Sequence, residues 1–275
     1  MFCTMAMNKL INFYRFLNIL SIDVALGAVC CAAWFAQFFD ISLRGSELVS
    51  LGLTVWMIYT ADHLMDAIKI EHEASTSNHR FHQRYFSTLL SALILAVICD
   101  GVLMFFIRKE VFHAGVVLLI AVTIYLLFNR SLSFLKEPLV AILYCTGILL
   151  PVLSIAGVSM MANALPIVMT FFTTVLINVV LFSWFDYEAD KRDGGRSLVI
   201  LFGLTITKRL LLILFTIQSI LILSITYRGV PGSVLFIIMN GLLLLLFIKS
   251  DFFRVKENYR LLGDMIFLFP IISFF

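Results

Sequence analysis

Charged side chains are scarce in this chain, because Asp, Glu, Lys and Arg make up only 13% of its 275 residues, against roughly one quarter in soluble globular domains. Hydrophobic residues make up 61%, and the mean hydropathy is +1.04. This shortage of charge excludes a soluble globular protein and predicts an integral membrane protein. The net charge of +3 is not gathered into a basic stripe, so the sequence gives no sign of nucleic-acid binding.

The chain also has few cysteines, and it has no stretch with the composition of an interdomain linker. None of the five cysteines has the spacing of zinc ligands, so they are interpreted as small buried hydrophobic side chains. No stretch rich in Pro, Gly or Ser divides the chain, which predicts a single domain over residues 1–275. No clear cleavage site or transit peptide follows Lys9 and Arg15, which favours a retained first helix and a bacterial inner membrane.

Long apolar stretches predict an all-α bundle of nine transmembrane helices, several of them near the roughly 20 residues that cross the hydrocarbon. The stretches are 16–39, 47–61, 86–107, 111–128, 138–158, 164–184, 207–226, 230–248 and 261–275. Of the 20 Lys and Arg residues, all but Arg44, Arg108, Lys109 and Arg228 fall on one side of this topology. By the positive-inside rule, that side is the cytoplasm and includes the N-terminus.

Two aspartate pairs stand at the predicted cytoplasmic ends of apolar segments. Asp62 precedes Asp66, and Asp186 precedes Asp190, in each case by four residues. Residues four apart lie on one face of a helix, so each pair presents two carboxylates in one direction. An ionisable residue in such a setting is a candidate functional site. Carboxylate oxygens suit hard divalent cations, so all four aspartates are predicted to be metal ligands and catalytic residues.

Four carboxylates on one membrane face repel one another unless cations lie between them. Two Mg²⁺ ions would neutralise them and complete their shells with phosphate oxygens, which predicts a clamp for a diphosphate. Basic residues near the same face are predicted to bind the diphosphate; they are Arg80, Arg130, Lys191 and Arg196. The rest of such a ligand must be apolar, and an isoprenyl chain fits. The 27 Phe, 8 Tyr and 3 Trp offer rings that can stabilise an allylic carbocation.

Other polar residues keep two interpretations each. Residues near 67–85 and 186–197 are too polar to span and are predicted to be cytoplasmic cap loops. His79 and His82 could ligate a transition metal, although the neighbouring carboxylates favour a hard ion and the histidines are expected to line the cap. Asp23 and Asn178 are predicted either to contact acceptor or substrate in the cavity, or to form a structural hydrogen bond between helices.

The sequence from Asp186 to Gly203, DYEADKRDGGRSLVILFG, resembles the second motif of the UbiA superfamily of intramembrane prenyltransferases. That motif is DxxxD followed by Gly, a basic residue, Ser or Thr, and a hydrophobic run ending in Gly. The family's first motif, NDxxDxxxD, is similar to residues 58–66: Asp62 and Asp66 match, while Ile58 and Tyr59 replace the leading Asn-Asp.

Two further segments are fainter matches to the family. Residues 125–130 resemble a Tyr-x3-Lys-Arg segment and retain Arg130, while residues 21–27 resemble the RxDKPxG pattern and retain Asp23 and Gly27. The resemblance implies a nine-helix bundle around a central cavity and Mg²⁺-dependent activation of a prenyl diphosphate. It implies transfer to a lipophilic acceptor, often aromatic.

Three other functions remain open from the sequence. A terpene cyclase shares the ionisation step and differs in the fate of the cation. A non-catalytic prenyl-lipid binder is compatible with a partial first motif. A cation-coupled transporter would place paired carboxylates near the membrane midplane on broken helices, whereas these pairs lie at cytoplasmic ends. The expected partners are a prenyl diphosphate, a lipophilic acceptor and membrane lipid, with no protein partner inferable.

Overall fold

The computed structural model describes residues 2–128, 135–156 and 158–274, and in these ranges the chain forms helices and no strand. The long α-helices, in chain order, are α1 (Phe2–Ile19), α2 (Ile22–Phe38), α3 (Gly45–Lys69), α5 (Phe86–Leu103), α6 (Lys109–Phe128), α7 (Lys136–Ala156), α8 (Val158–Arg192), α9 (Leu198–Tyr227) and α10 (Ser233–Ile248). The short elements are α4 (Ser77–Arg84), η1 (Met104–Phe106), α11 (Ser250–Arg254), η2 (Val255–Glu257), α12 (Asn258–Met265) and η3 (Ile266–Phe274), where η denotes a 3₁₀ helix.

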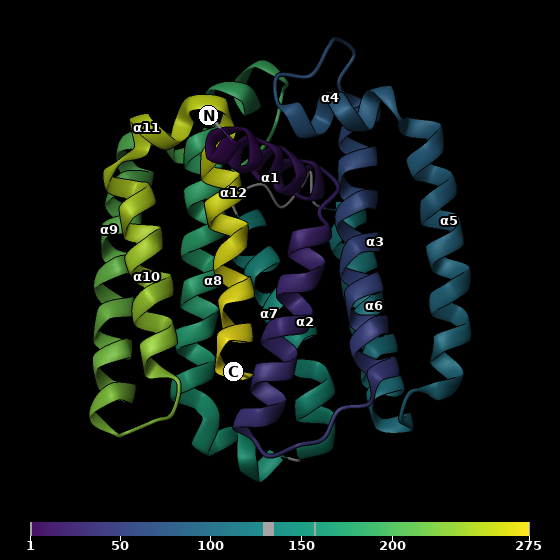
Figure 1. Cartoon of the computed structure of the whole chain (residues 1–275), viewed down its shortest axis with the longest axis vertical. Helices are drawn as coiled ribbons and strands as arrows, with labels where there is room; N and C mark the ends of the chain where they lie inside the picture. The colour runs from purple at the N-terminus through teal and green to yellow at the C-terminus, as the bar shows by residue number, and fades with distance from the viewer. Residues whose placement is uncertain (1, 129–134, 157, 275) are drawn as a thin grey trace.

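Most of the long helices run side by side along one axis (Figure 1). Within the described residues, six helices are long and apolar enough to cross a membrane, and up to eight spans result if each of two bent helix pairs counts as one. The chain is therefore an integral membrane protein of the all-α class, as predicted. The predicted count of nine spans is not confirmed, because both ends of the predicted topology are bent.

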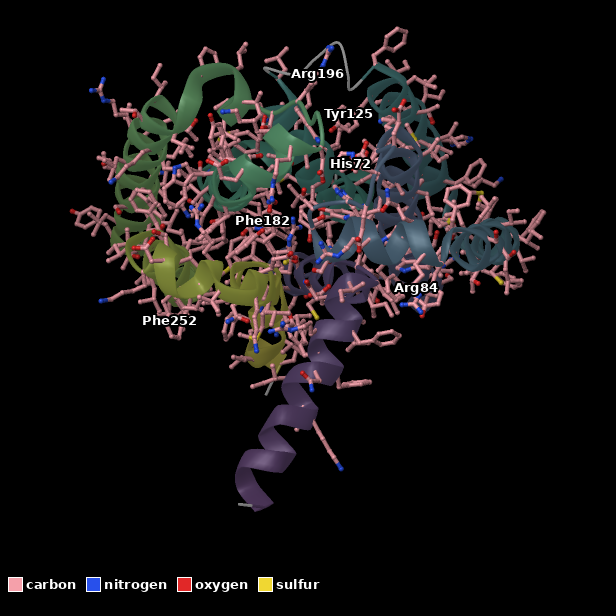
Figure 2. All side chains as sticks on the ribbon, turned by 90° about the horizontal axis from the view of Figure 1, so that it is seen from above. His72, Arg84, Tyr125, Phe182, Arg196 and Phe252 are labelled. Carbon is pink, nitrogen blue, oxygen red and sulfur yellow. The ribbon has the colours of Figure 1, made fainter. Side chains whose placement is uncertain are left out.

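The first bend divides the apolar segment that was predicted as one helix. α1 and α2 meet at 83°, because Ser21 takes a left-handed conformation with a φ of 55°, which interrupts the helical path. The indole nitrogen of Trp56 donates to the carbonyl oxygen of Leu20 at 2.9 Å and holds the bend against α3. Seen from above, α1 projects beyond the bundle (Figure 2), while α2 lies within it.

The second bend, of 87°, separates α10 from the segment that follows. Lys256 and Glu257 have positive φ angles of 55° and 56°, so the chain turns sharply before α12 begins. The predicted last helix starts three residues earlier than expected, at Asn258, and changes to 3₁₀ geometry at Ile266, ahead of Pro270, which cannot donate a backbone hydrogen bond. η3 contacts α2 and brings the C-terminal segment into the bundle.

Basic residues are distributed unequally between the connections at the two ends of the bundle. The connections before α3, between η1 and α6, and between α9 and α10 lie at the lower end in Figure 1. They hold Arg44, Arg108 and Arg228, and Lys109, the fourth basic residue predicted for the outer side, begins α6. The α3–α4, α8–α9 and α10–α11 connections lie at the opposite end, with the N-terminus. The C-terminal ends of α3 and α8 therefore reach the same end of the bundle.

The core of the bundle is formed where α8 meets its neighbours. Phe35 of α2, Ile148 of α7 and Phe171 of α8 are almost completely buried. Close contact between helices depends on small residues: a Cβ on Gly27 would lie 2.8 Å from the Cβ of Phe267, so α2 and η3 approach at a glycine, as is common in membrane bundles. This packing fixes α3, α7, α8 and α12 around the polar end described next.

Candidate functional site

Asp62 and Asp66 lie on one face near the C-terminal end of α3. Asp66 accepts a hydrogen bond from the Lys69 ammonium at 2.8 Å. One carboxylate oxygen of Asp62 is buried without a hydrogen-bond partner among the described residues, and Asp62 lines a cavity inside the bundle. A buried carboxylate oxygen with no donor is costly, so this atom is suited to accept from a ligand.

Asp186 and Asp190 lie near the C-terminal end of α8, which continues through both residues to Arg192; the predicted cap loop therefore begins only after Arg192. Arg260 of α12 donates from Nη2 to Asp186 at 2.7 Å, and the Tyr259 hydroxyl donates to the other oxygen of Asp186. Asp190 accepts a hydrogen bond from the Ser197 side chain. Each carboxylate is thus positioned by a residue from another element.

The two pairs converge on shared neighbours. Lys136, at the start of α7, lies within electrostatic range of Asp62, Asp66 and Asp190. His79 of α4 lies within such range of Asp66 and Asp186. One ammonium group among three carboxylates offsets part of the repulsion between them. The two acidic helix ends therefore face one space.

The turn between α8 and α9 explains the Gly-Gly and Ser positions of the second motif. Gly194 has a φ of 70°, which favours glycine. A Cβ on Gly195 would lie 3.1 Å from the Cβ of Asp190, so the turn passes close to the carboxylate. Ser197 caps α9 by accepting from the backbone nitrogen of Ile200.

Glu137 anchors this turn and was not predicted as a site residue. One of its oxygens accepts from the Ser183 hydroxyl at 2.7 Å and from the backbone nitrogen of Leu198 at 2.9 Å. Because Glu137 directly follows Lys136 in α7, the same helix start supplies the cation and fixes the α8–α9 turn.

The polar segment after α3 is fastened over this end of the bundle. Asp193 accepts from the Ser75 backbone nitrogen at 2.9 Å and from the Ser75 hydroxyl at 2.6 Å, and lies 3.3 Å from Nε2 of His72. Burial opposes ionisation of Asp193, but these hydrogen bonds and His72 hold its pKa below the usual value. Ser77 donates to Glu257. The segment thus joins α4 to the α8–α9 turn and to the residues before α12.

The cavity that begins at Asp62 has a volume of about 570 Å³ and runs between α3, α5, α6 and α7. Near the acidic end it is lined by Tyr59, Tyr125 and Lys136, and its walls are otherwise mostly apolar. Figure 2 places Tyr125, His72 and Arg196 on the same side of the bundle, looking down on the acidic end. The site is therefore a charged mouth that leads into an apolar chamber.

Three of the four cations predicted to bind diphosphate can be placed. Arg80 is exposed and donates from Nη1 to the carbonyl oxygens of Ala74 and Ser75, at 3.0 and 2.9 Å. The ammonium of Lys191 lies 5.8 Å from the centroid of the Tyr187 ring. Arg196 is exposed in the α8–α9 turn and interacts with another group of the protein. Arg130 lies outside the described residues.

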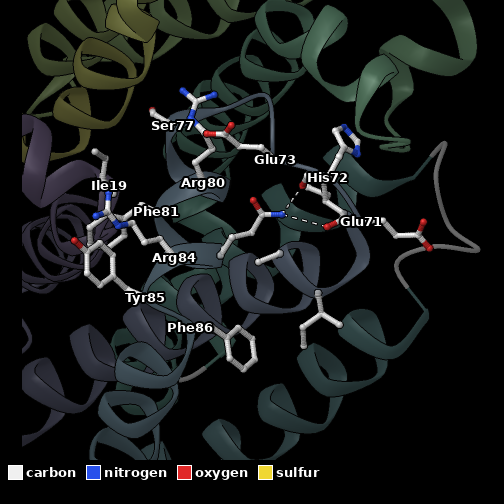
Figure 3. Close-up of a pocket in the computed structure, with 14 residues that line it drawn as sticks. Ile19, Glu71, His72, Glu73, Ser77, Arg80, Phe81, Arg84, Tyr85 and Phe86 are labelled. Atoms are coloured by element: carbon white, nitrogen blue, oxygen red, sulfur yellow. Dashed lines mark hydrogen bonds between the residues drawn. The ribbon is translucent and has the colours of Figure 1, made fainter.

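Arg80 also lines a second hollow, of about 790 Å³, on the surface beside α4 (Figure 3). There Gln83 donates from Nε2 to the carbonyl oxygens of Ile70 and His72, at 3.2 and 3.0 Å. These bonds shape the segment that precedes α4. The role of Arg80 in this geometry is to hold that segment, and its predicted contact with diphosphate stays a prediction.

The two predicted cavity residues lie at helix–helix contacts. Asn18 donates from Nδ2 to both Asp23 and Asp264, at 2.7 Å in each case, which ties α2 to α12. Asn178 faces α12, because its Oδ1 would lie 2.9 Å from a Cβ on Gly263. Neither residue lines the cavity at Asp62. Asp23 is buried with Asn18, so its contacts match the interpretation as a structural hydrogen bond between helices.

Three histidine rings gather beside the acidic mouth. The ring of His63 is 4.8 Å from that of His82 and 5.7 Å from that of His79, between centroids. His63 and His82 each direct Nδ1 to a carbonyl oxygen of their own helix, so that nitrogen carries the proton. Burial lowers the pKa of His82, and burial followed by the charge of Arg260 lowers that of His79. The lowered pKa values favour the neutral form of the His79 and His82 rings.

Lys136 and Arg260 are candidate site residues that the sequence did not single out. Each is one of many basic residues near helix ends, where a positive-inside anchor is the ordinary interpretation. For Lys136 the available signal was its place at the start of an apolar helix that returns to the acidic end. For Arg260 the sequence offered no signal, because its contact with Asp186 depends on the bend before α12.

The fold can be compared with solved structures. The apo structure of a UbiA homolog from Aeropyrum pernix K1 is similar to this chain with a TM-score of 0.65 and 13% identity, over 93% of this chain and 97% of that one. The chain has the UbiA fold. A structure of digeranylgeranylglyceryl phosphate synthase is also similar, with a TM-score of 0.51 and 15% identity, over 92% of this chain and 97% of that one. No protein-family model and no curated protein matches the sequence.

The UbiA fold was the fold expected from the sequence resemblance, and the structure confirms it. Within the described residues, no group of three or more His, Cys, Asp or Glu side chains is placed to hold a metal ion. Mg²⁺ commonly uses one or two carboxylates and takes its other ligands from water and substrate phosphate. The unpartnered oxygen of Asp62, with Asp190 within electrostatic range of the same Lys136, fits that mode of binding.

Proposed function

We propose that this chain is an intramembrane prenyltransferase that ionises a prenyl diphosphate and transfers the prenyl group to a lipophilic acceptor of aromatic type. The observation that carries the proposal is the convergence of Asp62, Asp66 and Asp190 on Lys136. This charged group stands at the mouth of an apolar chamber within a UbiA fold. A ligand with an anionic head and an apolar tail matches both parts of the site.

In this mechanism the diphosphate lies between the ends of α3 and α8. In this proposal the Lys136 ammonium donates hydrogen bonds to the diphosphate oxygens, while Tyr259 and Arg260 keep Asp186 in place. Mg²⁺ held by the aspartates together with the diphosphate would neutralise the charge of the leaving group. Heterolysis of the allylic carbon–oxygen bond gives its electron pair to the diphosphate, and Lys136 stabilises that developing charge most when the bond breaks.

The apolar chamber holds the other product of this heterolysis, the allylic carbocation. Tyr59 and Tyr125 line the cavity next to the mouth, and the negative faces of aromatic rings attract a nearby cation. The apolar walls limit the access of water, which would otherwise capture the carbocation. The acceptor then supplies the electron pair for the new bond and loses a proton.

The neighbouring structures support a prenyl substrate in general. One of them is named as a digeranylgeranylglyceryl phosphate synthase, a name that describes prenyl groups joined to a glyceryl phosphate. The segregation of basic residues supports placing the aspartates at the cytoplasmic side of the membrane.

The proposal is tested by incubating the purified protein in lipid nanodiscs with allylic diphosphates of several chain lengths, with and without Mg²⁺. We expect Mg²⁺-dependent release of diphosphate, and we expect Asp66→Ala and Asp190→Ala each to lower the rate by two or more orders of magnitude, roughly the contribution of one electrostatic group. Asp251→Ala is the matched control, because Asp251 is exposed in α11.

The products separate the rival functions. A prenylated acceptor supports transfer, and a cyclic hydrocarbon released without an acceptor identifies a terpene cyclase. Binding without release identifies a non-catalytic prenyl-lipid binder. Cation uptake into sealed vesicles, with neither binding nor release of diphosphate, identifies a transporter and contradicts the proposal.

A further inference from the structure

The end of the cavity away from the charged mouth holds a second carboxylate. Asp100 of α5 lines this end and is only 3% exposed. Its Oδ2 accepts from the Thr54 hydroxyl of α3 at 3.2 Å, whereas its Oδ1 is buried and has no partner among the described residues. A buried acceptor without a donor is unfavourable, so this atom is placed to receive one from outside the chain.

Glu47 provides a contrast at the same end of the cavity. Its carboxylate accepts from the Arg44 backbone nitrogen at 2.8 Å and forms an ion pair with Nε of Arg108 at 3.1 Å. Glu47 therefore serves to join the start of α3 to the residues before α6. Asp100 has no such cation beside it in the described contacts, which distinguishes it from a structural carboxylate.

The two polar ends of the cavity are separated by an apolar middle. Thr54 and Asp62 lie on α3, and a helical rise of 1.5 Å per residue places them roughly 12 Å apart. Between them the lining includes Ile58, Leu119 and Val122. A ligand that fills this space meets charge at the mouth, hydrocarbon along the middle and a hydrogen-bond acceptor at the far end.

We propose that the far end of the cavity binds the remote polar terminus of an elongated apolar ligand, a hydroxyl or ammonium group that donates to Asp100. The apolar middle takes the hydrocarbon chain, and Thr54 holds the carboxylate so that Oδ1 faces the ligand. The cavity therefore selects apolar chains that carry a hydrogen-bond donor at the end opposite the charged mouth. This inference goes beyond the proposed function, because a plain prenyl chain carries no donor at its remote end, and its binding step needs no diphosphate.

The test compares two neutral probes, a linear primary alcohol and the alkane of equal carbon number, by equilibrium binding to the full chain in nanodiscs. We expect the alcohol to bind at least about tenfold more tightly, the increment of one hydrogen bond to a charged group. Asp100→Leu should bring the ratio of the two affinities close to one. Asp251→Leu, in exposed α11, should leave the ratio unchanged.

Asp100→Asn decides the matter if Asp100→Leu does not fold. It keeps the size of the side chain and one acceptor, so it should lose most of the preference for a long-chain amine over the alkane and keep part of the preference for the alcohol. An alcohol-to-alkane ratio that is unchanged in Asp100→Leu, or that is close to one in the wild type, overturns the inference. So does a ratio lost in Asp190→Ala but kept in Asp100→Leu. None of these readings depends on diphosphate release.

Discussion

At the scale of single residues, the charge balance of the mouth depends on Lys136. Three carboxylates from two helices lie within electrostatic range of this one ammonium. A Lys side chain presents a compact charge with three rotatable donors, so it can leave the carboxylates and bond to phosphate oxygens when a ligand enters. The same group can thus stabilise the empty site and recognise the ligand.

Lys136→Gln is expected to weaken binding of a prenyl diphosphate by about tenfold or more, because the substitution removes a charge-assisted hydrogen bond to phosphate. The measurement is a dissociation constant in nanodiscs. Lys249→Gln is the control, because Lys249 is exposed between α10 and α11 at the same end of the bundle. Equal affinities of wild type and Lys136→Gln would show that the ammonium does not contact the ligand.

Burial of His82 makes the stability of the protein depend on pH and fixes the direction of that dependence. Its pKa in the folded chain lies below the usual 6.5, because burial disfavours the charged form. Below pH 6.5 the unfolded chain binds a proton that the folded chain does not, so His82 makes the protein less stable as pH falls from 6.5 towards its folded pKa. Above pH 6.5 this contribution is absent.

Thermal unfolding of wild type and His82→Gln, followed between pH 5 and pH 8, measures this contribution. We expect the difference between the two melting temperatures to change below about pH 6.5, in the direction that favours His82→Gln as the pH falls. A difference that is constant over the whole range would mean that the folded chain accommodates the protonated ring.

At the scale of elements, the site is held by close contacts between helices. α12 positions Tyr259 and Arg260 against Asp186, and α12 itself approaches α8 at Gly263. The sequence could not predict this contact, because the bend before α12 arises from left-handed residues at Lys256 and Glu257, which have no distinctive sequence pattern. The apolar segment that follows was correctly located but was read as one plain helix.

Gly263→Ala is expected to destabilise the protein by about 1–3 kcal/mol, because a Cβ there would lie 2.3 Å from the Phe182 ring. Gly241→Ala in α10 is the matched control, since a Cβ at that position meets nothing within 4 Å. Thermal unfolding of both variants makes the comparison. Phe182→Leu in the Gly263→Ala background should restore part of the lost stability, and failure of that rescue would mean that the glycine is needed for another reason.

At the scale of the whole molecule, the sequence predicted the parts of the fold and site that are local. Helix type, the segregation of basic residues and the face shared by each aspartate pair follow from apolar length and from four-residue spacing. The role of Lys136 did not follow, because it depends on three helices meeting. The place of Asp100 in the cavity lining did not follow from the sequence either, since lipid-facing and cavity-facing positions are equally apolar in a membrane bundle and periodicity does not separate them.

The central claim is that the ends of α3 and α8 hold one ligand together. A double-mutant cycle tests it most directly, with dissociation constants of a non-ionising prenyl thiodiphosphate measured for wild type, Asp62→Asn, Asp190→Asn and the double variant in the presence of Mg²⁺. We predict a coupling free energy of about 1 kcal/mol or more between the two sites, as groups that share a ligand are not independent. The pair Asp62→Asn with Asp251→Asn should show none. Additive losses for Asp62 and Asp190, to within about 0.3 kcal/mol, would contradict the account.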